Sequence, residues 1–402
     1  MVKESFPPDR QTKTLSPSSI ISKSEIALAT ERLSFLFSLF FSKRVSAMPI
    51  SFRSPLGFYF SDFFKMLLLI VLLIFPLPSF SGVVLVYHHV ADDTPVVTSI
   101  TIAQFERHLE TIEENGYEVV PLEMLTQTSL KSFSLDKKLS ITFDDGYKNI
   151  LTNAFPLLKK RGWPFTIFVS TKFVGISKSY LSWEDLDYLE RNGATIGNHT
   201  HSHGHLVRLG PNETEGDWLA RVESEIITAR EILNEKGHNS QIFAYPYGEY
   251  NEKVRNIVGK LGMMGFGQHS GAIGPVSDPL ILPRFPLAGV YTGIDALADK
   301  LGSMAMPLEM RYQPPLVGEN LRPSLKLKFT DPTLRLERVN CFGPGGLMEV
   351  SKISSTEISI KPKQELPVGR SRYNCTLRNK NRYFWYSQLW MRKNIDGTWY
   401  KE

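Results

Sequence analysis

The chain has 402 residues, of which 42% are hydrophobic and 22% are charged. These values are typical of a globular protein that can bury an ample core in one large domain and a smaller one. The net charge of +5 is unevenly distributed, because residues 321–402 hold sixteen Lys and Arg against seven Asp and Glu, whereas residues 82–320 are net acidic. No recognised nucleic-acid motif accompanies the basic segment, so we exclude nucleic acid as the expected partner.

Residues 1–61 carry no catalytic pattern, and the first 47 of them are rich in Ser and Lys. We expect this segment to be disordered, or to be upstream sequence that is never translated. Met48 and Met66 are the alternative start residues, and we favour Met48.

Residues 62–81 have the features of a secretory signal. Lys65 precedes a wholly apolar run from Met66 to Phe75, and Ser79 and Ser81 place small residues at a cleavage site. The apolar run is short for a membrane span, which needs about 20 residues, although a retained N-terminal anchor is the alternative. Either way, we expect the rest of the chain to be exported: secreted, periplasmic or anchored at the membrane.

Residues 82–315 alternate between apolar strand patterns and helical patterns. Regular alternation of this kind predicts parallel strands with helices outside them, in an open sheet or a (β/α) barrel. Thr101 and Gln104 form a predicted capping box, and the helix that they start closes at Gly116. The predicted strands are 83–90, 118–120, the strand that ends at Phe143, 165–170, 194–198, 241–245 and 263–267, and the other predicted helices are 147–161, 182–192, 216–236 and 250–261.

Residues 321–402 lack any helix-length periodic run and predict a small, basic, all-β and sandwich-like domain. Its basic face is a candidate for holding the protein on an anionic glycan or membrane surface; the alternative is a domain that only stabilises the rest. The predicted strands are 325–329, 334–339, 347–353, 357–360, 371–377 and 383–390.

The chain has two cysteines, Cys341 and Cys375, and both lie in this basic region. In an exported protein we expect them to form a disulfide, which would stabilise the fold by roughly 4 kcal/mol in the chain-entropy model. Two free buried thiols are the alternative.

Two clusters of chemically active residues follow predicted strands. Asp144 and Asp145 come directly after a strand and precede Gly146, and adjacent carboxylates are costly unless a cation or hydrogen bonds absorb their charge. Strand alternation would send the two side chains in different directions, so one could bind a metal while the other faces substrate. Residues 197–206 contain four histidines, and imidazoles with carboxylates are the ligand set of a transition metal. An ordinary Asp-Asp-Gly turn is the alternative for the first cluster.

Together these residues resemble the polysaccharide deacetylase family, also called the NodB-homology or carbohydrate esterase 4 family. The first matching motif is Thr142-Phe143-Asp144-Asp145-Gly146, the second runs from His199 to Leu206, and the third is Pro246-Tyr247-Gly248. The opening strand, with Tyr87-His88-His89, is similar to that of the biofilm poly-N-acetylglucosamine deacetylase subgroup. The resemblance covers about residues 83–290 and implies a (β/α) barrel-type catalytic domain over 82–315.

The resemblance also implies a role for each matching residue. Asp144 matches the general base, and Asp145, His199 and His203 match the ligands of a divalent metal, for which zinc is favoured and other divalent transition metals are alternatives. The i, i+4 spacing of the two histidines suits one face of a helical turn. Pro246 and Tyr247 match the loop at the substrate, where the backbone N–H of Tyr247 would stabilise the oxyanion.

Several residues lie outside this pattern. The family often supplies a late histidine as general acid; His269 is the nearest candidate here, and a loop histidine without a catalytic role is the alternative. Arg284 is a site candidate because the subgroup has a similar late segment in which an arginine could orient a catalytic carboxylate. His201 and His205 do not match ligand positions. Trp183 and Trp218 could stack on sugar rings, although packing of their helices is the preferred interpretation.

The resemblance therefore implies a metal-dependent hydrolase that removes N-acetyl groups from a GlcNAc-containing polysaccharide. An O-acetyl esterase on the same scaffold is one alternative, because the same activated water can attack an ester. A carbohydrate-binding protein without turnover is the other, although all four core residues are present. The expected partner is the acetylated polysaccharide substrate.

Overall fold

The computed structural model describes residues 81–130, 137–309 and 314–401. The predicted upstream segment and all but the last residue of the predicted signal lie outside these ranges, so both stay predictions. Residues Leu77–Glu402 form one compact unit, and the domain boundary expected near 315–321 is likewise a prediction. Within the described ranges, no helix has the length and apolar character needed to cross a membrane.

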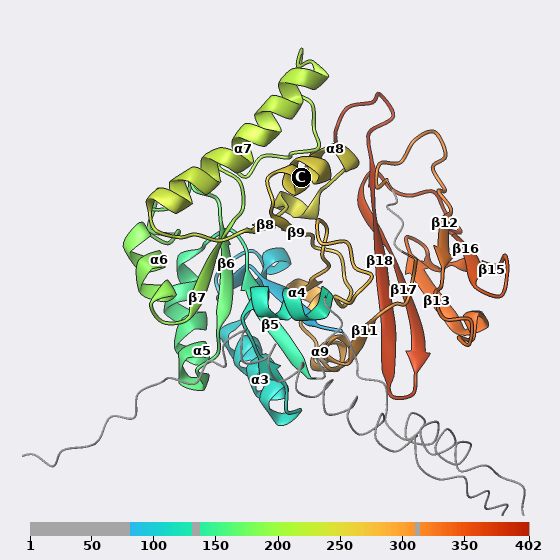
Figure 1. Cartoon of the computed structure of the whole chain (residues 1–402), viewed down its shortest axis with the longest axis horizontal. Helices are drawn as coiled ribbons and strands as arrows, with labels where there is room; N and C mark the ends of the chain where they lie inside the picture. The colour runs from blue at the N-terminus through green and yellow to red at the C-terminus, as the bar shows by residue number, and fades with distance from the viewer. Residues whose placement is uncertain (1–80, 131–136, 310–313, 402) are drawn as a thin grey trace, which may run out of the picture. The chain divides into compact units, whose positions relative to one another are not determined.

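A parallel sheet forms the centre of the N-terminal half (Figure 1). Its strands follow the order β10-β1-β5-β6-β7-β8-β9, and β4 pairs with the start of β5. All five residues of β1 and of β6 are buried, as expected for strands covered on both faces. The strands are β1 (Val83–Tyr87), β4 (Glu118–Val119), β5 (Lys138–Phe143), β6 (Phe165–Val169), β7 (Ala194–Asn198), β8 (Ile242–Ala244), β9 (Met264–Phe266) and β10 (Phe285–Pro286). A short parallel pair, β2 (His89–Val90) and β3 (Ser99–Ile100), follows β1.

The segment that leads into β10 connects the two ends of this sheet. Leu282 forms a parallel bridge with Phe266 of β9, and its carbonyl accepts the N–H of Gly267. Three residues later, Phe285 pairs with Leu85 of β1. The strands therefore curl round on themselves, which confirms the predicted (β/α) barrel-type architecture.

Helices connect the strands and cover the outside of the sheet; Figure 1 shows α5, α6 and α7 on the outer side of β6 and β7. The predicted capping box is present: Thr101 Oγ1 accepts the N–H of Gln104, whose side chain accepts the N–H of Thr101. Such a cap is typically worth about 1 kcal/mol. The helices are α3 (Ile102–Glu114), α4 (Leu122–Leu130), α5 (Phe155–Arg161), α6 (Trp183–Glu190), α7 (Glu215–Glu235), α8 (Glu252–Lys260) and α9 (Ile294–Leu301).

Two sheets form the C-terminal region, as the sandwich-like prediction requires. One has the order β11 (Ser303–Ala305), β18 (Arg382–Arg392), β17 (Gly369–Asn379), β13 (Val339–Gly343) and β14 (Gly346–Leu347). The other consists of β12 (Leu325–Lys328), β16 (Glu357–Lys361) and β15 (Glu349–Lys352). In Figure 1, the long strands β17 and β18 stand between the barrel and this smaller sheet.

The five-stranded sheet uses both of its faces for packing. Tyr373 and Trp390 join a core with residues of the smaller sheet, such as Leu325. Leu389 and Met391, which alternate with Trp390 along β18, join a core that is otherwise formed by barrel residues. The C-terminal region is therefore packed against the barrel over an apolar surface.

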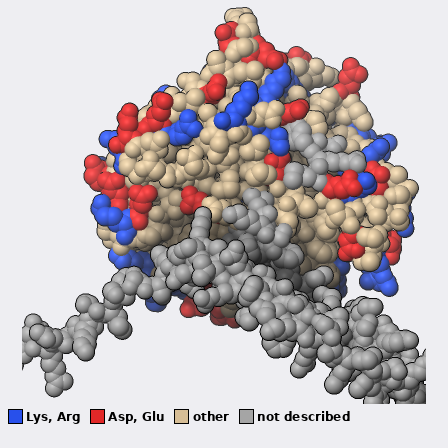
Figure 2. Space-filling view, in the orientation of Figure 1, with Lys and Arg blue, Asp and Glu red and all other residues tan. Residues whose placement is uncertain are grey.

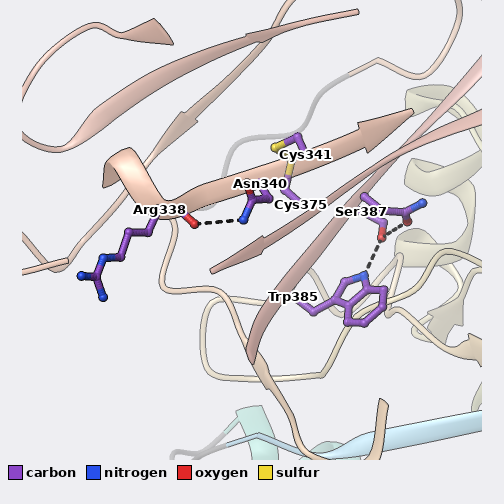
Figure 3. Close-up of a disulfide and its surroundings, with 7 residues drawn as sticks. Arg338, Asn340, Cys341, Cys375, Trp385 and Ser387 are labelled. Carbon is purple, nitrogen blue, oxygen red and sulfur yellow. Dashed lines mark hydrogen bonds between the residues drawn. A yellow bond between two sulfur atoms is a disulfide. The ribbon is translucent and has the colours of Figure 1, made fainter. Parts of the chain in front are cut away.

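The two cysteines form a disulfide, as predicted (Figure 3). Cys341 of β13 and Cys375 of β17 are directly opposite each other in an antiparallel pair, and both are fully buried. The bond therefore links neighbouring strands of one sheet within the C-terminal core.

Two local predictions need correction. The strand expected at 334–339 is instead a 3₁₀ turn at Leu336–Arg338, and the strand β13 begins only at Val339. The buried residues of the range, Leu336 and Val339, are three positions apart, which does not fit strand alternation. The helix expected at 147–161 becomes regular at Phe155, after a π-helical segment at Ile150–Ala154. Pro156 has no N–H for the regular ladder, and the wider turn accommodates it.

Candidate metal and catalytic site

The candidate residues gather at the C-terminal ends of the parallel strands, where (β/α) barrels place their chemistry. Asp144 and Asp145 follow β5, His199 follows β7, and the Pro246–Gly248 turn follows β8. The segment that closes the barrel contributes Arg284. Strands far apart in the sequence thus bring all of the predicted site residues of the barrel to one end of the sheet.

Asp145, His199 and His203 form a cluster in which one potential ligand atom of each lies within 4.8 Å of the others. Asp145 Oδ1 lies 3.4 Å from His199 Nε2 and 3.1 Å from His203 Nε2. Asp145 Oδ1 and His199 Nε2 are buried and have no hydrogen-bond partner among the residues that the structure describes. Buried polar atoms without partners are costly, and a cation between them would remove that cost.

The donor set fits a divalent transition metal. His199 Nδ1 lies 2.8 Å from the carbonyl oxygen of Ala244, which accepts its proton and leaves the Nε2 lone pair directed at the cluster. Two imidazoles and one carboxylate leave positions for water and substrate, as a hydrolytic site requires. The cluster could therefore hold the predicted metal.

A loop, and not the predicted helical turn, brings the two histidines together. Thr200 and His203 have positive φ values of 70° and 59°, so the chain turns sharply twice. Thr200 Oγ1 accepts the N–H of His203, and the carboxylate of Glu225 in α7 accepts the N–H and the hydroxyl of Ser202. Side-chain hydrogen bonds of this kind compete with helix formation, which explains the loop.

Asp144 has a different environment from its neighbour. It is fully buried and forms a two-pronged ion pair with Arg284, whose Nη1 and Nη2 donate to Oδ1 and Oδ2 at 2.7 and 2.8 Å. The arginine, also fully buried, donates further to the carbonyl of Gly267 and to Thr142 Oγ1. The structure thus brings Arg284, a candidate from the sequence, into direct contact with this carboxylate.

The electrostatics of the two acids follow from these partners. Burial raises the pKa of Asp144, but the charges of Arg284 and His199 outweigh it, so the net pKa lies below its ordinary value. Burial also raises the pKa of Asp145, and the adjacent imidazoles of His199 and His203 outweigh it and hold the pKa well below the ordinary range. The two side chains have different partners, but both residues follow the end of β5, and Asp145 has a positive φ of 71°, so strand alternation does not apply to them.

The Pro246–Gly248 turn lies beside the metal cluster. Tyr247 has a φ of 60°, and its ring centroid is 4.7 Å from that of His203. Gly248 also has a positive φ, and a Cβ there would come within 2.7 Å of Gln268 Cβ. The turn is therefore pressed against the segment after β9, which fixes where the Tyr247 backbone can lie.

Three residues near the site were not singled out from the sequence. Gln268 Nε2 donates to Asp144 Oδ2 at 3.2 Å, and His88 Nε2 lies 4.0 Å from the same oxygen. Glu249, which follows the turn, is fully buried beside His205. Of these, His88 could have been found, because it directly follows a buried strand of the barrel.

His269 occupies a different environment from the one expected of a general acid. Its ring lies 5.8 Å from that of Tyr250, and its Nδ1 is buried without a hydrogen-bond partner in the described part of the chain. Burial lowers its pKa to about 3. The preceding residue, Gln268, contacts Asp144 in its place.

The remaining candidates have structural contacts. His201 Nδ1 lies 2.9 Å from Thr171 Oγ1, and His205 Nδ1 lies 2.8 Å from Glu249 Oε2. Trp218 is buried in a core and donates to the carbonyl of Leu206, while the ring of Trp183 stacks on His238. These positions agree with the packing roles that were preferred for the two tryptophans.

Comparisons with known proteins cover the segment that holds most of this site. Residues 134–266, which include both aspartates, the histidine cluster and the Pro246–Gly248 turn, match the family model described as polysaccharide deacetylase. YxkH of Bacillus subtilis, whose name places it among the polysaccharide deacetylases, is 32% identical over 195 residues. The match covers 47% of this chain and 65% of that protein.

Two further relatives carry more specific names. A poly-β-1,6-N-acetyl-D-glucosamine N-deacetylase of Staphylococcus epidermidis is 28% identical over 194 residues, which cover 46% of this chain and 67% of that protein. The structure of IcaB from Ammonifex degensii aligns with a TM-score of 0.49 and 25% identity, over 55% of this chain and 97% of that one. The chain thus spans about two thirds of the length of the curated relatives that it matches. Residues 134–266 are thus similar to the polysaccharide deacetylase family.

Proposed function

We propose that the protein is a metal-dependent hydrolase that removes N-acetyl groups from a GlcNAc-containing polysaccharide. The observation that carries the proposal is the pair of adjacent carboxylates with different partners: Asp144 held by Arg284, and Asp145 beside His199 and His203. The names of the staphylococcal relatives support GlcNAc polymers as the substrate class.

Asp145, His199 and His203 are the proposed metal ligands. When bound there, a divalent ion supplies Lewis acidity at the acetyl carbonyl and for the attacking water. Zinc is favoured because imidazole and carboxylate are among its usual ligands, and the same donors also suit other divalent transition metals.

The chain's own groups account for the proton transfers. Asp144, kept anionic by Arg284, takes a proton from the attacking water, and the Tyr247 backbone N–H donates to the carbonyl oxygen as it becomes negative. The amide C–N bond then breaks, acetate forms, and the leaving amine needs a proton. We assign that proton to His88, because its Nε2 lies 4.0 Å from Asp144 Oδ2 and its side chain is 16% exposed.

Export and surface attachment are further proposals. The disulfide between Cys341 and Cys375 supports an oxidising compartment and so agrees with the proposed export signal. Attachment to an anionic surface would use the basic C-terminal region, but some of its cations serve inside the molecule. Arg322 and Arg382 donate to backbone carbonyls, and on the face drawn in Figure 2 the basic side chains stand among acidic ones.

The test measures acetate and free amine together, with purified, metal-loaded protein and three substrates: poly-N-acetylglucosamine, chitin oligomers and peptidoglycan. Equal release of acetate and amine is expected, with a loss of about 10²–10⁴-fold in Asp144→Asn. The exposed Asp295→Asn variant is the control and should keep full activity. Acetate without new amine would indicate an O-acetyl esterase, and no product from any acetylated polymer would refute hydrolysis.

A further inference from the structure

A buried carboxylate connects the catalytic loop to the C-terminal region. Glu249 directly follows the Pro246–Gly248 turn and is fully buried. Its Oε2 lies 2.8 Å from His205 Nδ1, and its Oε1 accepts Tyr400 Oη at 2.6 Å and Arg208 Nη2 at 3.3 Å. Arg370 Nη1 lies 3.6 Å from the same oxygen. A buried charge is costly unless it is paired and hydrogen-bonded, and here both oxygens are engaged.

The partners of Glu249 come from three separate parts of the chain. His205 and Arg208 belong to the loop that also carries His203, Arg370 belongs to β17, and Tyr400 lies in the C-terminal tail. Arg208 Nη1 donates to the carbonyl of Tyr400, and its guanidinium lies 4.6 Å from the centre of the Tyr400 ring. The tail is thus tied to the histidine loop and to Glu249 at the same time.

The same contacts hold Tyr247. Arg370 Nη1 donates to the Tyr247 carbonyl at 3.1 Å, and its guanidinium lies 5.4 Å from the Tyr247 ring centre. The ring of His205 stacks on the Tyr247 ring at 3.9 Å with an interplanar angle of 12°. Tyr247 therefore packs against one partner of Glu249 from the barrel and another from the C-terminal region.

Tyr247 needs such support because its backbone is strained. A φ of 60° in a non-glycine residue costs about 1–2 kcal/mol and persists only where the surroundings fix it. The N–H that we assign to oxyanion stabilisation belongs to this residue, and its ring touches that of His203. Oxyanion donors are effective only when they are fixed before the reaction, so a shift of this backbone would reduce turnover.

We propose that Arg370 and Tyr400, acting through Glu249, are positioning residues that hold the Tyr247 backbone in its catalytic conformation. The C-terminal region is then a working part of the active site and not an independent attachment module. This inference rests on the proposed hydrolase function. Two other roles make different predictions: docking of the C-terminal region alone, and direct binding of the glycan, since Arg370 and Tyr400 also line a surface pocket with Asn394 and Lys401.

The variants are Tyr400→Phe, which removes one hydroxyl, and Arg370→Met with Arg370→Lys as its conservative counterpart. The matched control is Arg382→Met. Arg382 also links the C-terminal region to the barrel side, because its Nε donates to the Gly302 carbonyl after α9, but it does not contact Glu249 in any described interaction. If docking alone mattered, Arg382→Met and Arg370→Met would have similar effects.

The first measurement is steady-state kinetics with metal content recorded for each variant. We expect kcat to fall by about 10- to 100-fold in Arg370→Met and less in Tyr400→Phe, with KM and metal content near wild type. Arg370→Lys should recover part of kcat, and Arg382→Met should keep it. A rise in KM alone would overturn the proposal in favour of glycan binding, and an equal fall in Arg382→Met would overturn it in favour of docking.

The second measurement does not depend on turnover. The N–H groups of Gly248 and Glu249 donate to Tyr245 and Pro246 carbonyls within the turn, so their hydrogen exchange reports its stability. Exchange should be faster in Arg370→Met and Tyr400→Phe and unchanged in Arg382→Met. Unchanged exchange in both site variants would overturn the inference even if the wild type is an active deacetylase. Faster exchange with an inactive wild type would uphold the contact and refute the proposed function instead.

Discussion

Replacing Arg284 with methionine should remove the group that keeps Asp144 ionised. The carboxylate is fully buried and accepts two hydrogen bonds from the guanidinium, so the variant would leave a buried charge without a counter-charge. Gln268 would remain as a neutral donor to Oδ2. Burial, which already acts to raise the pKa of Asp144, would then prevail, and the pKa should rise above its ordinary value.

The expected loss of stability can be bounded. Removing one partner of a buried ion pair typically costs about 3–5 kcal/mol. The arginine also donates to Gly267 and Thr142, which favours the upper part of that range. Protonation of Asp144 limits the loss, because each unit by which its pKa rises corresponds to about 1.4 kcal/mol.

The contribution of Asp144 to stability should depend on pH differently in the wild type and in Arg284→Met. In the wild type, the pKa of Asp144 is lower in the folded state than in the unfolded state. The carboxylate therefore stabilises the fold fully when the pH is above its unfolded-state pKa, and this stabilisation is lost as the pH falls through the folded-state pKa. In Arg284→Met the folded pKa is raised, so folding is favoured at low pH and this contribution declines as the pH rises above about 4. Between about pH 4 and 7 the wild-type contribution is therefore constant, whereas that of Arg284→Met declines as the pH rises.

The assay is chemical denaturation of the full chain at several pH values, together with the pH profile of turnover. Turnover at neutral pH should fall by about 10²–10⁴-fold, and its acidic limb should move to higher pH. Arg284→Lys should not restore activity, because an ammonium cannot reproduce the two-pronged contact. The double variant Asp144→Asn/Arg284→Met should be less destabilised than the sum of the single variants, since it buries no unpaired charge. An additive double variant, or an unchanged pH slope in Arg284→Met, would refute this account of Asp144.

Three further predictions concern other parts of the chain. Purified protein should contain about one divalent ion per chain. The metal content should fall strongly in His203→Ala and stay unchanged in the control His201→Ala. Stoichiometric metal in a His199/His203 double alanine variant would contradict the ligand assignment. The pKa of His269 is lowered to about 3, so stability should fall as the pH drops from about 6.5 toward 3, and this group should account for at most about 5 kcal/mol of the fall. His269→Gln should remove this part of the pH dependence of the unfolding free energy measured by denaturation. An unchanged pH dependence would count against a buried neutral ring. The whole chain should bind anionic vesicles at low salt and release them as salt rises, because each basic contact is worth about 1 kcal/mol and is screened; no binding at low ionic strength would leave the C-terminal region with its structural role alone.

Local patterns were sufficient to predict most of the barrel. Buried strands such as β6 and the capped start of α3 depend on side-chain periodicity and on one reciprocal hydrogen-bond pair, both of which are visible in the sequence. The failures were also local: Pro156 converts a helix start into a π-helical segment, and Thr200 and His203 adopt positive φ values that residue type does not favour. Such conformations depend on tertiary partners, here Glu225 of α7, which a short window of sequence does not contain.

The core of the site was predictable because its motifs lie at strand ends, whereas its supports come from distant segments. Arg284 was named as a candidate, but its contact with Asp144 joins residues 140 positions apart. Glu249 and Tyr400 are 151 positions apart, and neither belongs to a recognisable pattern. The basic composition of residues 321–402 suggested an anionic surface, yet Arg370 faces the catalytic loop. Composition records how many cations a region has and contains no information on which of them face inward.

Three carboxylates at this end of the barrel, two of them fully buried and Asp145 partly buried, have different partners, and those partners favour different tasks. Asp144 is balanced by a permanent cation, which keeps it negative while leaving it able to accept a proton. Asp145 faces two imidazoles, and this set of three could hold a metal ion. Glu249 is enclosed by one imidazole, two guanidinium groups and a phenol, so neither of its oxygens is left for substrate. Because a carboxylate acts through the groups that balance its charge, we propose that only the first two belong to the chemistry and that the third fixes the loop on which that chemistry depends.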